Sequence, residues 1–294
     1  MFKLIVGATL GAAAARAAYT ALTNRPPGLN GLPGKEVWGR TNHRGEPVTL
    51  LEGPAFVAGS TAATLLARGM SSRVRTAALL AGAGSGLLGA YDDLAGSASS
   101  RGFKGHLSAL ARGEVTSGAV KLLGIGATGL VAAAIAGTSA RSKPGALADV
   151  AINGAIIAGA ANLMNLFDLR PGRAIKVGLL TGSPLALGAG AAIVAAPLGA
   201  AAALLPDDLA EQAMLGDAGA NALGALLGLS ATRLGRGPRL GVLAGLIALN
   251  AASEKVSFTK VIRENPALNW LDMLGRRPAE PVFVPEQPVA DAAK

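Results

Sequence analysis

Charged residues are so scarce in this chain that the intervals between them are long enough to cross a lipid bilayer. Asp, Glu, Lys and Arg make up 15% of the 294 residues, whereas apolar residues make up 51%. A soluble domain of this length carries about a quarter charged residues to cover its surface. The positive mean hydropathy of +0.43 also indicates that part of the protein surface faces an apolar solvent in addition to water. We therefore expect an all-α, polytopic helix bundle embedded in the lipid bilayer.

The rest of the composition limits how the helices pack and which kinds of metal site and partner are expected. The 41 glycines and the aromatic content of 3% favour close helix packing, because small residues let helices approach each other in lipid. The absence of cysteine excludes thiol chemistry, and the two histidines argue against a histidine metal site, so any metal would be a hard cation held by carboxylates. The net charge of +9 is spread singly among loops without interleaved aromatics. Anionic headgroups or phosphorylated substrates, and no nucleic acid, are therefore the expected partners.

Nine apolar segments separated by turn-rich stretches are candidate spans, since a span needs about 20 apolar residues. They cover residues 2–22, 49–68, 76–93, 118–137, 146–167, 174–187, 188–204, 213–232 and 238–253. The sixth and seventh are short and meet at Gly188 and Gly190, which indicates either a half-spanning helix or a tight helical hairpin. The prediction is a transmembrane domain of about nine to ten helices over residues 1–253 and a cytoplasmic tail over residues 254–294.

The first segment has features of a cleaved signal peptide, namely Lys3, a short apolar core and Ala-x-Ala steps. Arg16 interrupts the apolar run and the pattern continues past it, which favours a retained first helix. An N-terminus outside the cell places more of the loop Lys and Arg residues on the cytoplasmic side, chiefly through those of the tail.

Acidic residues stand at the edges of three predicted spans. Asp92 and Asp93 close the third, Asp168 closes the fifth and Asp217 opens the eighth. A carboxylate at the edge of a span is costly and commonly functional. In the nine-span topology these acids all lie on one membrane face, beside the longest basic loops. Carboxylates from separate helices can hold Mg²⁺ for chemistry on a substrate diphosphate.

The helical period predicts how these side chains point. Asp92 and Asp93 project about 100° apart on a helix, so they reach one point only if the helix ends there. Asn162, Asn165 and Asp168 step by three residues and form one polar stripe, which should face the bundle interior.

Other interpretations stay open for each position. Asp217, one turn before Asn221 on the same face, is also a typical helix N-cap. The Asp pair also fits a solvated turn, and the two asparagines fit hydrogen bonds between helices. Asp207, Asp208 and Glu211 are interpreted as part of a solvated loop before the eighth segment.

These motifs resemble those of the polyprenyl-phosphate N-acetylhexosamine-1-phosphate transferases, which include phospho-MurNAc-pentapeptide transferase. The family carries an Asp-Asp pair ending an early helix, an Asn-x-x-Asn-x-x-Asp-Gly-x-Asp-Gly segment, and a Gly-Asp-Thr-Gly-Ser segment opening a later helix. The matching residues, in the same order over roughly residues 80–230, are Tyr91-Asp92-Asp93, Asn162-x-x-Asn165-x-x-Asp168 and Gly216-Asp217-Ala218-Gly219-Ala220. Pro171 replaces the second Asp of the middle motif, Ala218 and Ala220 replace two hydroxyls, and the histidine-rich loop of many members is absent. The resemblance is therefore to a divergent member.

The resemblance implies transfer of a sugar 1-phosphate, such as N-acetylhexosamine 1-phosphate, from a UDP-sugar to undecaprenyl or decaprenyl phosphate. UMP is released at the cytoplasmic face of a bacterial plasma membrane, in cell-envelope polymer synthesis. Mg²⁺, or Mn²⁺ as an alternative, is the implied cofactor, and a homodimer is left open.

The resemblance also implies roles for individual residues. Asp217 is the principal metal ligand, Asp93 assists it, and Asp92 orients or deprotonates the lipid phosphate. The substrate-binding residues are Asn162, Asn165 and Asp168 for the nucleotide side, Lys104 and Lys121 for the phosphates, and Arg44, with Arg40, near the lipid phosphate. The basic loop around Arg44 is equally interpreted as a topology signal.

Two further hypotheses compete with the enzyme. One is a catalytically silent relative that binds the lipid carrier or acts as a scaffold, as the replaced motif residues suggest. The other is an ion channel or carrier, which is disfavoured because the acids lie at span ends and not at the midplane. The segment Phe258 to Arg276 is expected to be amphipathic at the membrane surface, either closing over the site or anchoring the chain.

Overall fold

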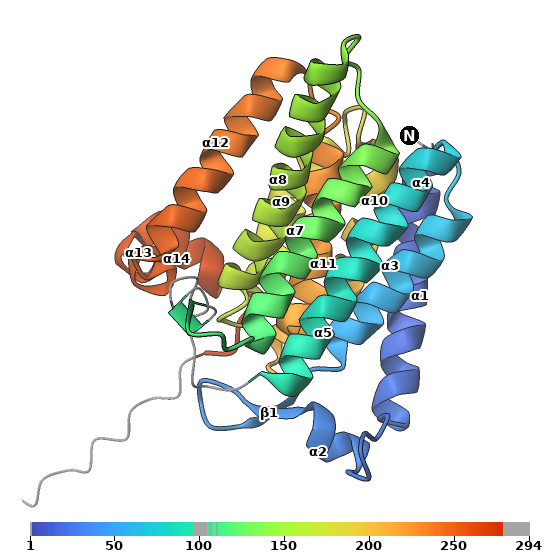
Figure 1. The fold of residues 1–294 in the computed structure, drawn as a ribbon. Coiled ribbons are helices and arrows are strands. Elements are labelled where there is room, and N and C mark those ends of the chain that lie inside the picture. The colour runs from blue at the N-terminus through green and yellow to red at the C-terminus, as the bar shows by residue number, and fades with distance from the viewer. Residues whose placement is uncertain (1, 97–104, 106–107, 110, 279–294) are drawn as a thin grey trace, which may run out of the picture.

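A computed structural model describes residues 2–96, 105, 108–109 and 111–278 of the chain. These residues form a bundle of helices whose axes run broadly along one direction (Figure 1). The one sheet within this described part is a hairpin of β1 (Gly39–Thr41) and β2 (Pro47–Thr49), which pair antiparallel.

The helices account for nearly all of the regular structure. Their bounds are α1 (Phe2–Asn24), α2 (Gly34–Trp38), α3 (Glu52–Leu66), α4 (Ser72–Leu79), the π-helical turn η1 (Leu80–Gly84), α5 (Ser85–Ala95), α7 (Ser117–Ala136), α8 (Lys143–Phe167), α9 (Arg173–Leu185), α10 (Ala191–Leu209), α11 (Gly216–Ala231), α12 (Arg236–Ser253), α13 (Phe258–Glu264) and α14 (Pro266–Met273). The expected all-α membrane bundle agrees with this architecture.

Helix α11 is the centre of the bundle. Every residue from Gly216 to Ala231 except Asp217 is buried. The helix contacts α3, α5, α8, α9 and α10, and its small residues let these neighbours approach closely. Because α11 is surrounded along its whole length, its first residue is held firmly at one end of the bundle.

The predicted number of membrane-spanning helices is wrong. Among the described residues, four helices are long and apolar enough to cross a bilayer: α1, α7, α8 and α10. A fifth is added if α12 and α13, which are bent by 98° relative to each other, count as one span. All nine predicted segments do contain helix, but α3, α9 and α11 have only 15, 13 and 16 residues. At about 1.5 Å per residue, helices this short fall below the hydrocarbon thickness of about 30 Å.

The helix boundaries bear on two local features. Helix α1 runs without a break past Arg16 and packs against α3 and α10. Helices α9 and α10 are separate, contact each other and are joined by a short turn that contains Gly188 and Gly190, so the pair forms a helical hairpin.

The contact between α1 and α10 depends on glycine. A Cβ added at Gly199 would lie 1.9 Å from the carbonyl oxygen of Ala8, and one at Gly11 would lie 2.0 Å from that of Ala196. Any larger residue must push the two backbones apart.

We expect Gly199→Ala to destabilise the protein by about 1 to 3 kcal/mol, the usual effect of overpacking. Thermal unfolding in detergent measures this as a lowered midpoint. Gly126→Ala is the matched control, because a Cβ at this helical position meets no atom within 4 Å. Equal midpoints for the two variants would contradict the close approach of α1 and α10.

Candidate functional site

The last turn of α5 sends its two carboxylates in different directions. The oxygens Oδ1 and Oδ2 of Asp93 accept the backbone amides of Asp217 and Ala218, at 3.1 and 3.0 Å. Leu215, the residue before α11, makes no side-chain capping bond. The first amides of a helix lack partners within the helix and carry partial positive charge. Asp93 therefore caps α11 from a neighbouring helix, and it fixes the position of Asp217.

Asp92 points instead toward α7. The ammonium of Lys121 lies 2.6 Å from Asp92 Oδ2 and 2.5 Å from Asp217 Oδ2. The ion pairs join α5, α7 and α11 at one end of the bundle, although the residues are far apart in the sequence. We call Asp92, Lys121 and Asp217 the carboxylate–lysine cluster.

The two backbones meet closely at this cluster because α5 carries a glycine there. A Cβ at Gly89 would lie 2.2 Å from the carbonyl oxygen of Asp217. The side chain of Arg40, from β1, donates a hydrogen bond to the backbone oxygen of Asp93 and so ties the hairpin to the same place. The expected gathering of acids at one end of the bundle is thus what the structure shows.

A polar cavity of about 210 Å³ lies beside the carboxylate–lysine cluster. Lys121, Asn162, Asn165 and Asn221 contribute to its wall, and we call it the amide cavity. The side chain of Asn221 is buried, and neither its oxygen nor its nitrogen has a partner among the described residues. Asn162 donates to Asn250 of α12 at 2.6 Å. The two asparagines of the predicted stripe therefore face the bundle interior.

Asp168 does not continue that stripe into the amide cavity. Helix α8 ends at Phe167, and Asp168 has left the helical conformation, with φ −79° and ψ 42°. It lines a second cavity of about 280 Å³, together with Arg170, Asp208 and Glu211. Burial, and then the negative charge of Asp208, raise the pKa of Asp168 well above its usual range. We call this the acidic cavity.

Asp208 and Glu211 were interpreted as solvated residues, and this interpretation is wrong. Both are buried, because α10 runs to Leu209, beyond the predicted end at residue 204. Asp208 Oδ1 accepts the amide of Gly172 at 2.9 Å, which holds the turn between α8 and α9. The apolar pattern of α10 gave no sign that its last turn faces the bundle.

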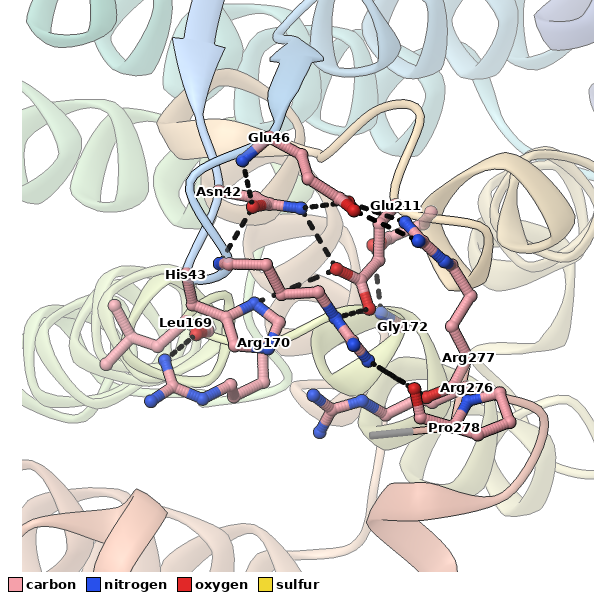
Figure 2. Close-up of polar contacts among 12 residues, drawn as sticks. Asn42, His43, Glu46, Leu169, Arg170, Gly172, Glu211, Arg276, Arg277 and Pro278 are labelled. Carbon is pink, nitrogen blue, oxygen red and sulfur yellow. Dashed lines mark hydrogen bonds and ion pairs between the residues drawn. The ribbon is translucent and has the colours of Figure 1, made fainter. Parts of the chain in front are cut away.

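Arg44 belongs to a separate cluster, whose members Glu46, Glu211 and Arg277 are labelled in Figure 2. Its Nε donates to Glu211 Oε1 at 3.0 Å, and its Nη2 donates to the backbone oxygens of Arg277 and Pro278 at 3.1 and 3.0 Å. Arg277 in turn donates to both carboxylate oxygens of Glu46, at 2.6 and 3.0 Å. The described contacts of Arg44 thus attach the C-terminal segment to the hairpin, next to the acidic cavity.

The C-terminal helices are attached by a second set of ion pairs. Arg173, at the start of α9, donates from Nε and Nη2 to the two oxygens of Asp272, at 2.7 and 3.0 Å. Lys176 donates to the backbone oxygen of Asp272 at 2.6 Å, and Arg276 pairs with the same carboxylate at 2.9 Å. The expected helical segment within residues 258–276 is present as α13 and α14.

Two predictions remain to be compared with the structure: Lys104 as a phosphate-binding residue, and Asp217 with Asp93 as metal ligands. Lys104 lies outside the described residues. Within the part of the chain that the structure describes, no group of three or more His, Asp or Glu side chains is arranged to hold a metal ion. Asp93, expected to assist Asp217 in binding the metal, accepts one backbone N–H on each carboxylate oxygen. Asp92 and Asp217 both pair with the ammonium of Lys121.

Comparison with protein-family models and with curated proteins finds no match for this sequence.

Removing the carboxylate of Asp93 should destabilise the protein, since the α11 amides would lose their acceptors. We expect Asp93→Ala to cost about 1 to 2 kcal/mol, the usual effect of a lost cap, and Asp93→Asn to cost less because it keeps one oxygen. Thermal unfolding measures both, and Glu264→Gln, an exposed carboxylate-to-amide change on α13, is the control. A midpoint for Asp93→Ala equal to that of the control would disprove the cap.

The attachment of α14 should depend on pH. Burial alone would raise the pKa of Asp272, but the hydrogen bond and charge of Arg173, with the charges of Arg276 and Lys176, lower it below its usual value. A lowered pKa means that the contribution to stability is complete above the unfolded pKa of about 3.9 and is lost as the pH falls through the folded value.

We therefore expect α14 to stay attached from neutral pH down to about pH 4 and to detach below it. The emission of Trp270, in a Trp38→Phe background, reports the change. Asp272→Asn should weaken the attachment at every pH above the transition and remove the transition itself. A transition of unchanged midpoint in Asp272→Asn would show that another group controls the attachment.

Proposed function

We propose that this chain is a membrane phosphotransferase that moves a sugar 1-phosphate from a UDP-sugar to a polyprenyl phosphate and releases UMP. The observation that carries the proposal is the carboxylate–lysine cluster. Asp92, Lys121 and Asp217 come from three helices and meet at one end of a membrane bundle. A site at that edge suits a reaction between a membrane lipid and a soluble nucleotide.

This reaction requires that the two substrates be positioned and that their negative charges be neutralised. An oxygen of the polyprenyl phosphate attacks the phosphorus that carries the sugar. The new P–O bond forms as the bond to the UMP oxygen breaks, and UMP leaves with that electron pair. A phosphate monoester is largely ionised near neutral pH, its second pKa being about 6, so a general base adds little. Lys121 supplies a positive charge where the negative charges of the two substrates gather.

The acids also fit a divalent cation. The Oδ2 atoms of Asp92 and Asp217 bind one ammonium at 2.6 and 2.5 Å, so both already face a single cation position. We propose these residues as ligands for Mg²⁺, with Mn²⁺ as the alternative, and Asp93 as the residue that positions Asp217. When bound, the ion would offset charge on the diphosphate.

Neighbouring cavities offer places for the rest of each substrate. The amide cavity presents uncharged donors and acceptors, including the unpartnered side chain of Asn221, which suit sugar hydroxyls and an N-acetyl group. An apolar cavity of about 310 Å³ lies between α8, α9, α11 and α12, with Met164, Phe167 and Leu246 in its wall. Its lining suits the hydrocarbon chain of the acceptor.

Cellular context follows from the same proposal. The reaction would take place at the cytoplasmic face of a bacterial plasma membrane, where nucleotide sugars are available, and would serve cell-envelope polymer synthesis. The acidic cavity, with Asp168 and Arg170 in its wall, is the proposed position for the nucleotide.

A catalytically silent lipid-carrier-binding protein is the second candidate. Lys121 neutralises both Asp92 and Asp217, and Asp93 is engaged by two backbone amides. The motif residues Pro171, Ala218 and Ala220 lack the side chains expected of the enzyme family. These features favour a protein that binds the lipid carrier at this site but does not catalyse the transfer.

The two candidates differ in UMP release. Purified protein in vesicles, given polyprenyl phosphate, Mg²⁺ and a panel of UDP-sugars, should release UMP and form a lipid-linked diphosphate sugar detectable by mass spectrometry. We expect Asp217→Asn and Asp92→Asn each to lower the rate by about 100-fold or more, because each removes a carboxylate ligand of the proposed Mg²⁺. Removal of Mg²⁺ by a chelator should have a similar effect.

Glu264→Gln is the control, since this exposed carboxylate lies on α13, away from the cluster. No UMP with any UDP-sugar, from protein that is folded and still binds polyprenyl phosphate, would overturn the enzyme and support the silent relative. Full activity in Asp217→Asn would exclude the carboxylate–lysine cluster as the site.

A further inference from the structure

The polarity of α14 is opposite to that of a helix that faces water. Asp272 is 8% exposed, whereas Trp270 and Leu274 are 66% and 52% exposed. Further exposed large apolar side chains of the segment are Val256, Val261 and Met273. A helix at a water-facing surface buries its apolar residues and exposes its carboxylates. The outer face of this segment is therefore suited to an apolar environment.

Contacts on the protein side hold this inverted orientation in place. Arg173 binds both oxygens of Asp272, and Lys176 binds its backbone oxygen. The ring of Phe258, at the start of α13, stacks on that of Phe167 at 5.3 Å between centroids. With the polar side bound to α9 and the first ring bound to the end of α8, the side chains of Trp270 and Leu274 remain exposed.

The direction of the segment fits a membrane surface. Helix α13 turns by 98° from α12 (Figure 1). The exposed side chains of Leu240 and Ile247 on α12 suit contact with lipid tails. If α12 crosses the bilayer, α13 lies along its surface, at the level where the hydrocarbon ends.

Cations accompany the apolar face. Lys255, Lys260 and Arg263 are exposed on the turn and on α13. Glu264 is the acid one turn after Lys260, at 3.9 Å from its ammonium, and leaves the other two cations available. Basic residues beside inserted apolar side chains are the pattern of helices that bind anionic lipid surfaces.

We infer that α13 and α14 form an interfacial anchor whose apolar face inserts at the boundary between headgroups and acyl chains, in the same bilayer that the bundle spans. The phosphates of anionic lipids are the partners of its cations. The anchor keeps residues 272–278 against the acidic cavity, through the contacts of Asp272 and Arg277. This inference does not depend on the proposed transferase activity.

The chain contains two tryptophans, so the test is direct. Full-length Trp38→Phe protein, which keeps Trp270, is reconstituted in phosphatidylcholine vesicles whose acyl chains carry bromine, either near the headgroup or near the chain end. We expect at least a twofold loss of Trp270 emission with bromine near the headgroup and a smaller loss with bromine near the chain end. Aqueous iodide should quench Trp270 little. Adding anionic lipid should deepen the quenching, and Lys260→Gln with Arg263→Gln should remove that increase.

A matched control moves the fluorophore to a loop. Glu114→Trp, in a background of Trp38→Phe and Trp270→Phe, places the probe at an exposed loop position, where iodide and not bromine should quench. If Trp38→Phe fails to fold, the part of the wild-type quenching that Trp270→Phe removes gives the same information. Quenching of Trp270 by iodide and not by bromolipid would overturn the inference. Quenching by bromolipid that appears only at low protein-to-lipid ratio would assign the face to a second copy of the chain.

Discussion

The buried N-terminus of α11 is the constraint on which the site depends. This helix is surrounded by its neighbours, and its first amides, which lack acceptors within the helix, are accepted by a protein group. Asp93 supplies both acceptor oxygens from α5. That requirement sets the rotation of the last turn of α5, and the rotation turns Asp92, about 100° away, toward Lys121 and Asp217. One capping interaction thus assembles the carboxylate–lysine cluster.

The C-terminal segment follows a different principle. Ion pairs of Arg173 with Asp272 and of Arg277 with Glu46 attach it, while the apolar side chains of Trp270 and Leu274 are exposed. In water this arrangement would expose apolar surface without compensation. Beside a bilayer it lets the same helices satisfy the ion pairs on one side and lipid on the other. The segment therefore connects the membrane surface to the wall of the acidic cavity.

Sequence patterns predicted the helices better than the spans. Each of the nine apolar segments contains helix, and the paired acids do gather at one end of the bundle. The number of spans was overestimated because a run of apolar residues shows that a helix is buried, without showing whether lipid or protein surrounds it. Helix α11 is the clear case, since its apolar sequence reads as a span and its 16 residues lie within the protein core.

Sequence alone indicated the class of environment and the approximate helices, because these depend on composition and on local period. The tertiary structure decided the partner of each acid. Asp93 and Asp92 are neighbours in the sequence, yet one caps a helix and the other pairs with a lysine 29 positions away from it. Asp208 reads as a loop residue and is buried. Such partners come from helices brought together by packing, and no local pattern of residues records which faces will meet.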